Sequence, residues 1–121
     1  MNFKQALFLF SVVSVLMLSG CASAPKSTYY WGGYEKLIHD MYVDPGSIDP
    51  AIQIAQLTGD IQQAQNNSQP SPPGVHAHLG YMYSLQGNVE LSTAEFLEEK
   101  KLFPESASFI DGMLMRAKEH L

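Results

Sequence analysis

The side chains in this sequence that could do chemistry are four histidines and one group of acids. They are His39, His76, His78 and His120, together with Glu95, Glu98 and Glu99. On a helix, the side chains of His76 and His78 would point to different faces, so a zinc site would need further ligands from elsewhere. Carboxylates can do acid–base work, but no nucleophile or phosphate-loop motif accompanies these acids. We therefore predict no catalytic residue, no metal site and no cofactor, with His76 in a packing position and the other histidines and the acids solvated.

A second kind of chemistry centres on the only cysteine, Cys21. Lys4 precedes an apolar run from Ala6 to Leu18, which is shorter than the roughly 20 residues needed to span a bilayer. A positive start, a short apolar run and then small residues are typical of a signal peptide. The sequence Leu18-Ser19-Gly20-Cys21 resembles the bacterial lipobox, which implies cleavage after Gly20 and a lipid on the Cys21 sulfur.

An ordinary signal peptide cut at Ala22-Ser23-Ala24 is the alternative, but the apolar run, the lipobox and the cysteine stand in the order found in lipoproteins. Stable anchoring takes two acyl chains or more, and the lipoprotein pathway supplies them. Ala22, in place of Asp, resembles the Gram-negative sorting signal for the outer membrane. We expect a signal peptide at 1–20, a lipidated tether at 21–28 and a domain at 29–121 on the periplasmic face of the outer membrane.

Length and charge restrict the remaining functions. The chain has 121 residues, which suits one small domain, and a net charge of −5. Lys100-Lys101 is the only pair of adjacent basic residues, so we expect no nucleic-acid partner. If Cys21 is acylated, no thiol remains for a disulfide, a nucleophile or a metal site.

The apolar spacing from Tyr34 onward predicts the helices that must position these side chains. Apolar residues recur at the i, i+3, i+4 and i+7 intervals of one buried helix face, and no segment alternates as a strand does. The predicted inward-facing residues are Tyr34, Leu37, Ile38, Met41 and Tyr42; Ala51, Ile54, Leu57, Ile61 and Ala64; Val75, Leu79, Met82 and Tyr83; Leu91, Phe96 and Phe103; and Phe109, Ile110, Met113, Leu114, Ala117 and Leu121. The pattern predicts an all-α fold of about five helices in short antiparallel hairpins.

Turn and capping residues separate these helices. Asp and Asn side chains accept hydrogen bonds from free amides at a helix start, Pro suits the first turn, and Gly readily takes the left-handed conformation at a helix end. The signals are Asp49-Pro50 before the second helix, Pro72-Pro73 in the first turn of the third, Gly87-Asn88 between the third and fourth, Pro104 after the fourth, and Ser106 or Ser108 before the fifth.

Residues 73–106 resemble one tetratricopeptide repeat, a helix–turn–helix unit of about 34 residues. The matching residues are Leu79-Gly80, Tyr83, Gly87, Ser92, Phe96 and Pro104. In this interpretation Gly80 and Ser92 let two helices approach closely, while Tyr83 and Phe96 fill the space between them. Glu99 stands where a small residue is usual and His76 where a large aromatic is usual, so we expect looser packing against a following hairpin.

Three stretches resemble small Gram-negative lipoproteins of the family catalogued as domain of unknown function 4810. They are Tyr30-Trp31-Gly32-Gly33-Tyr34-Glu35, Pro72-Pro73-Gly74-Val75-His76-Ala77-His78-Leu79-Gly80 and Phe103-Pro104-Glu105-Ser106. Members of that family resemble tetratricopeptide proteins, and their genes tend to lie beside a gene for a lipoprotein similar to the curli-secretion pore. The resemblance implies an envelope protein as partner, with a curli-pore-like lipoprotein as the candidate.

The aromatic run Tyr29, Tyr30, Trp31 and Tyr34 allows three interpretations. It could pack on the first two helices and complete a small core. It could also bind a partner, since Tyr and Trp are frequent anchors, or lie in the membrane interface, which suits the same rings.

Together these features lead us to expect a non-enzymatic accessory lipoprotein that binds another envelope protein. The expected contact residues are Tyr30, Trp31, Tyr34, His76, Tyr83 and Asn88. A small ligand-binding or cell-wall-acting lipoprotein and a self-assembling structural lipoprotein are the alternatives. The sequence leaves the oligomeric state open.

Overall fold

The computed structural model describes residues 2–5, 8 and 27–119. Cys21, most of the expected signal peptide, the tether up to residue 26, His120 and Leu121 lie outside the described residues. No helix in the described part of the chain is long and apolar enough to cross a membrane.

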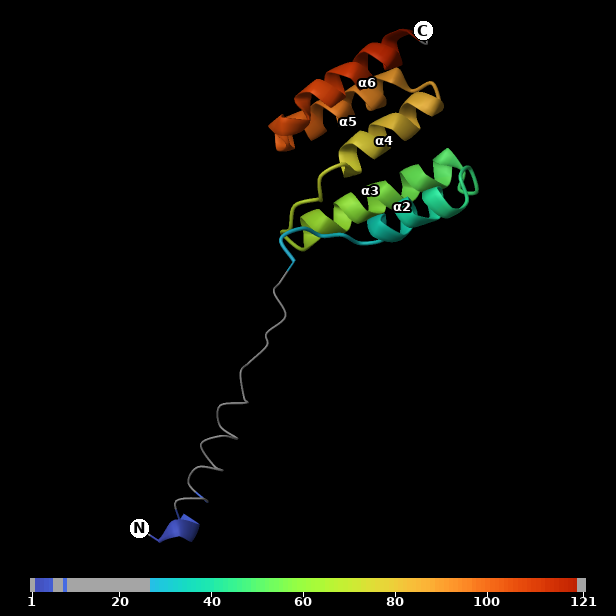
Figure 1. Cartoon of the computed structure of the whole chain (residues 1–121). Coiled ribbons are helices and arrows are strands. Elements are labelled where there is room, and N and C mark those ends of the chain that lie inside the picture. The colour runs from blue at the N-terminus through green and yellow to red at the C-terminus, as the bar shows by residue number, and fades with distance from the viewer. Residues whose placement is uncertain (1, 6–7, 9–26, 120–121) are drawn as a thin grey trace.

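The domain is a row of antiparallel helices in chain order (Figure 1). The helices are α2 Tyr34–Val43, α3 Pro50–Asn66, α4 Val75–Leu85, α5 Val89–Leu102 and α6 Ala107–Glu119, with a single 3-10 turn, η1 Pro104–Ser106. Within residues 27–119 there is no strand, so the predicted all-α fold of about five helices is confirmed.

The predicted caps of α3 and α5 are confirmed. Asp49 accepts a hydrogen bond from the Ala51 amide at 2.8 Å, and Asn88 accepts one from the Leu91 amide at 3.1 Å. Gly87 ends the α4 segment with a φ of +74°, which only glycine takes at little cost.

The predicted start of α4 is wrong by a few residues, because Pro72 and Pro73 precede the helix instead of forming its first turn. Gly74, with a φ of +95°, separates the prolines from Val75. A left-handed residue cannot belong to a right-handed helix, so the helix begins directly after it.

Two apolar clusters form the core, and α4 contributes to both. The first cluster joins α2, α3 and α4 and consists of Tyr34, Leu37, Leu57, Val75, Leu79 and Met82. The second joins α5 and α6 through Phe96, Ile110 and Ala117, with Ala77 of α4 packed against it. Because α4 lies in the middle, it connects the first hairpin to the last two helices.

The closest helix pair is α4 and α5, and it depends on small residues as predicted. A Cβ atom added to Gly80 would lie 2.9 Å from the Phe96 ring and 3.0 Å from the Ser92 carbonyl oxygen. Phe96 and Ser92 are fully buried. The glycine therefore allows the α5 backbone to approach α4 directly.

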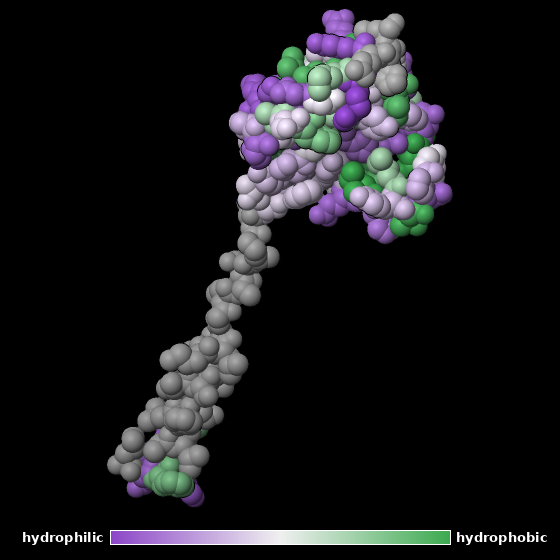
Figure 2. Space-filling model, turned by 45° about the horizontal axis from the view of Figure 1, so that its top comes forward, coloured by the Kyte–Doolittle hydropathy of each residue, from purple (hydrophilic) through white to green (hydrophobic). Residues whose placement is uncertain are grey.

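Four predicted core positions are exposed instead, namely Tyr42, Ala51, Leu91 and Phe109. Tyr42 is 86% exposed and Phe109 is 61% exposed. Both lie on the edge helices α2 and α6, which have a helical neighbour on one side only. A narrow stripe of apolar side chains is therefore enough to fill the contact with that neighbour. The exposed apolar side chains lie in separate patches among hydrophilic ones on the face shown in Figure 2.

Candidate functional site

The segment before α2, which carries the aromatic run, is fastened to α3 and to the α3–α4 loop. The Tyr30 amide donates to the Pro70 carbonyl at 2.9 Å, and the Gly33 amide donates to the Asp60 carboxylate at 3.0 Å. Gln56 donates to the Gly33 carbonyl at 3.1 Å. A side chain at residue 32, whose φ is +49°, would overlap Asp60, so this close approach requires glycine.

The aromatic residues themselves divide between the core and the surface. Tyr34 is buried in the first cluster, whereas Tyr29 and Tyr30 are half-buried. Tyr29 makes edge contacts with Trp31 at a ring separation of 6.4 Å and with Phe103 at 6.2 Å. Trp31 remains 38% exposed, so it is the member of the run most open to a partner or a membrane.

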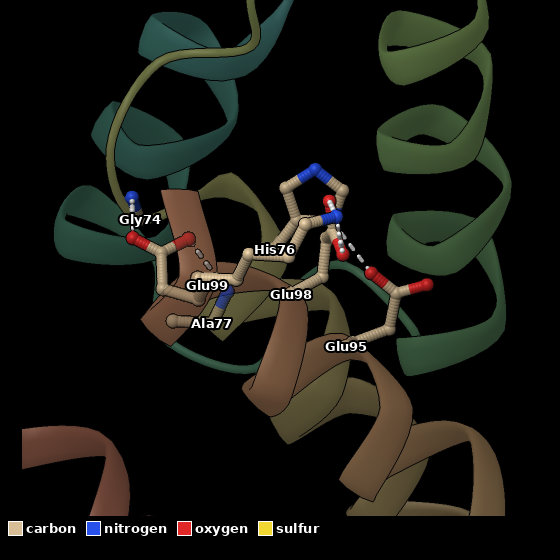
Figure 3. Close-up of polar contacts among 7 residues, drawn as sticks. Gly74, His76, Ala77, Glu95, Glu98 and Glu99 are labelled. Atoms are coloured by element: carbon tan, nitrogen blue, oxygen red, sulfur yellow. Dashed lines mark hydrogen bonds and ion pairs between the residues drawn. The ribbon is translucent and has the colours of Figure 1, made fainter. Parts of the chain in front are cut away.

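The acid that was expected to be solvated, Glu99, is instead 2% exposed and holds the start of α4 (Figure 3). Its carboxylate accepts hydrogen bonds from the Gly74 amide at 2.8 Å and from the Ala77 amide at 3.2 Å. The first amides of a helix have no partner within it, and the Gly74 cap has no side chain to supply one. A carboxylate from α5 therefore caps α4, where the helix dipole also favours negative charge.

Tyr34 lies beside this cap. Burial, and secondarily the negative charge of Glu99, raise the pKa of the Tyr34 phenol from 10.0 to about 12. A Cβ atom added to Gly74 would lie 3.0 Å from the phenol oxygen, so Tyr34 and the Gly74 turn are packed together. Tyr34 is thus a neutral core residue in this conformation, as its place in the predicted inward-facing stripe indicates.

His76 makes a short hydrogen bond across the same helix pair. Its Nδ1 lies 2.7 Å from Glu95 Oε2, with both side chains mostly covered (Figure 3). Glu98, one turn further along α5, pairs with Lys101 at 3.0 Å on the surface. The packing role predicted for His76 is confirmed, and the pairing with Glu95 adds a polar link between α4 and α5.

His78 was expected to be solvated, but it is buried between α3 and α4. Its Nε2 lies 2.9 Å from Gln53 Oε1, and the Gln53 amide group donates to the Ile48 carbonyl at 2.8 Å. Because an amide oxygen only accepts, Nε2 carries the proton and Nδ1 is the buried nitrogen that has no partner in the described structure. Burial lowers the pKa of His78, since a second proton would place a positive charge on a ring that is shielded from water.

The remaining expected contact residues lie at the other end of α4. Tyr83 is half-buried against the first core cluster, and Asn88 is exposed while its side chain caps α5. A groove of about 690 Å³ opens beside them, between the end of α4, the start of α5 and the second half of α6. Sequence reasoning missed this groove, since it depends on how α4, α5 and α6 pack against one another.

None of the described residues form a group of three or more histidine, cysteine or acidic side chains that could hold a metal ion. His76 and His78 diverge from α4 as their spacing predicts, the first toward α5 and the second toward α3. His76, His78 and Glu99 thus make polar contacts between neighbouring helices.

The fold places this chain in the class of small all-α proteins built from antiparallel helical hairpins. The chain belongs to the family described as "Domain of unknown function (DUF4810)", whose model matches residues 28–113. That match spans the aromatic segment and most of the helical domain. Neither the curated proteins nor the solved structures provide a significant match.

Proposed function

We propose that this protein is a non-enzymatic accessory lipoprotein, anchored at the periplasmic face of the outer membrane, that binds another envelope protein through its helical domain. The observation that carries the proposal is the structural use of the reactive side chains. Glu99 caps α4, His76 pairs with Glu95, and His78 is bonded to Gln53. These groups hold the helices together, which favours a binding role over catalysis.

The anchor in this proposal is Cys21, through the lipobox-like sequence before it. The link from Cys21 to Ser27 can span at most about 20 Å. Ser27 accepts a hydrogen bond from the Gln69 side chain at 3.1 Å, beside the α3–α4 loop. An acylated Cys21 would therefore keep this end of the domain close to the membrane.

The partner in this proposal is an envelope protein, with a curli-pore-like lipoprotein as the candidate. The tetratricopeptide-like features of α4 and α5 support a binding role, because Gly80 and Ser92 permit the close helix pair of such repeats. Helical repeats of this kind expose long surfaces suited to other proteins.

Crosslinking in intact cells followed by affinity purification tests the proposed function. The tagged chain is expected to recover an envelope protein reproducibly from membranes. A Cys21→Ser variant, which lacks the proposed anchor, is the matched control and is expected to lose that partner. Recovery of no envelope protein by the unaltered chain, at a normal level of expression, would contradict the proposal.

A further inference from the structure

The groove at the end of α4 has apolar walls, and a buried aromatic ring lies at its base. Tyr81 and Leu85 of α4 form one wall and are 42% and 54% exposed. Met113 and Ala117 of α6 form the other wall, and the buried Phe96 ring closes the floor. Exposed apolar side chains that line a common depression are typical of a surface that another molecule covers.

Among the described residues that line the groove, Arg116 is the one with a charged side chain. Its guanidinium lies 2.9 Å from the Met113 sulfur and folds back over Gly112, where a Cβ atom would be 3.7 Å from it. Sulfur is a weak acceptor, so this contact itself uses little of the guanidinium's hydrogen-bonding capacity. A carboxylate that entered the groove would be a stronger partner, because its two oxygens can accept hydrogen bonds from two N–H groups of the guanidinium.

We propose that this groove is the docking site for a peptide segment of a partner protein that inserts apolar side chains between α4 and α6 and sets a carboxylate against Arg116. The apolar walls favour apolar side chains in the peptide, and Arg116, the one cation among the described lining residues, favours a carboxylate. A second copy of this chain fits less well, since each copy carries a net charge of −5. The inference rests on the proposed binding function and assigns it a surface.

The position of the groove agrees with that role. The chain enters the domain beside Pro70, before α4, whereas Leu85 and Val89 place the groove at the α4–α5 turn. These points lie at opposite ends of the hairpin (Figure 1). If Cys21 anchors the first end, the groove faces away from the membrane, where a partner can reach it.

Peptide arrays probed with the full chain in mild detergent test the inference. Each short peptide carries two apolar residues from the set Leu, Phe, Ile, Met and Trp, and is printed with Glu, Gln or Lys at one flanking position. The chain is expected to bind the best Glu peptides about fivefold more tightly than their Gln counterparts, the effect of a partly exposed ion pair. Equal binding of the Glu, Gln and Lys versions would overturn the proposal.

Charge reversal at the groove gives the sharpest test. Arg116→Gln is expected to remove the preference for Glu, and Arg116→Glu is expected to transfer it to the Lys peptides. Lys118→Gln, on the same helix but outside the groove lining, is the matched control and should retain the Glu preference. A Glu preference that survives Arg116→Glu would place the site elsewhere.

The apolar wall is tested in the same way with Leu85→Ala. Its control is Leu97→Ala on α5, which removes a similarly exposed leucine outside the groove. Only the first substitution should weaken binding, with unchanged circular dichroism in both variants. Equal losses would contradict the assignment, as would self-association of the chain, detected by light scattering, that prevents peptide binding.

The peptide arrays and the crosslinking experiment distinguish an error in the assigned groove from an error in the proposed function. If the arrays show no preference while crosslinking still recovers an envelope partner, another surface binds that partner. If the arrays show the preference while the chain carries no lipid, the result supports the docking groove and contradicts the lipid anchor at Cys21.

Discussion

At the scale of single residues, several side chains that first suggest chemistry connect neighbouring helices, namely Glu95, Glu99, His76 and His78. Glu99 is the clearest case, because one carboxylate satisfies two amides at the start of a neighbouring helix. A buried charge is tolerated only where it is hydrogen bonded, and the α4 terminus supplies those bonds. The same residue contributes to the raised pKa of Tyr34.

Replacing Glu99 with Gln should lower the free energy of unfolding by about 1–3 kcal/mol, since a neutral amide has one acceptor oxygen and brings an NH₂ group toward a second donor. Urea unfolding measures the change. Glu98→Gln is the matched control and should cost about 1 kcal/mol or less, because Glu98 pairs with Lys101 at the surface. Equal losses in the two variants would contradict the capping role.

The burial of His78 leads us to predict that the domain is less stable in mild acid. The pKa of His78 is lowered from 6.5 by burial, so below pH 6.5 the unfolded chain takes up a proton more readily than the folded one. The free energy of unfolding should therefore fall as the pH drops below 6.5, by at most about 1.4 kcal/mol per pH unit for this one group.

The measurement compares unfolding between pH 7 and pH 5 for the unaltered chain and for His78→Gln, which keeps an amide donor near Gln53. The variant should show a flatter pH dependence than the unaltered chain. A slope that is the same in the two proteins would refute the assignment.

At the scale of the elements, the α4–α5 contact determines how closely the two halves of the domain approach. Gly80→Ala should lower the free energy of unfolding by about 1–3 kcal/mol, because the added methyl group meets the Phe96 ring and the backbone oxygen of Ser92. Gly59→Ala is the opposite case, since nothing lies within 4 Å of its added Cβ atom. This change within α3 should raise stability by about 1 kcal/mol.

Thermal and urea unfolding of the two glycine variants test this contrast. The same chemical change should alter stability in opposite directions at the two positions. A neutral or stabilising Gly80→Ala would mean that α4 and α5 have room to separate without loss.

The helices and most of their ends could be predicted because their signals are local, although the start of α4 was misplaced by a few residues. Asp49, Gly87 and Asn88 act on residues next to them in the chain, so their types indicate their roles directly. The roles of Glu99 and Gln53 depend on which helix lies opposite, and a single-helix pattern treats a polar residue as exposed. His78 gave a usable hint, since it shares the buried face of Val75, Leu79 and Met82.

At the scale of the whole molecule, the domain combines two hairpins and a final helix with an N-terminal segment fastened across them. A domain of this size buries a small core, so we expect its stability to depend on additional contacts. Tyr29 provides one of these through its edge contact with Phe103, directly after α5, and Trp31 packs against Tyr29.

Trp31→Ala separates the interpretations of the aromatic segment. The edge contact with Tyr29 predicts a loss of stability of about 1 kcal/mol, which thermal unfolding would show. If recovery of the partner per folded molecule is unchanged, the segment serves the core. If recovery falls while stability is nearly intact, Trp31 belongs to the contact surface.

The central claim is that the chain acts as an anchored binding protein, and its most direct test is the mass of the mature N-terminal peptide. Intact and digested protein from membranes is measured by mass spectrometry, with Cys21→Ser as the control. The account predicts an N-terminus at Cys21 that carries diacylglycerol, and no such mass in the variant. A mature chain with an unmodified Cys21, or one that begins after residue 21, would contradict the account.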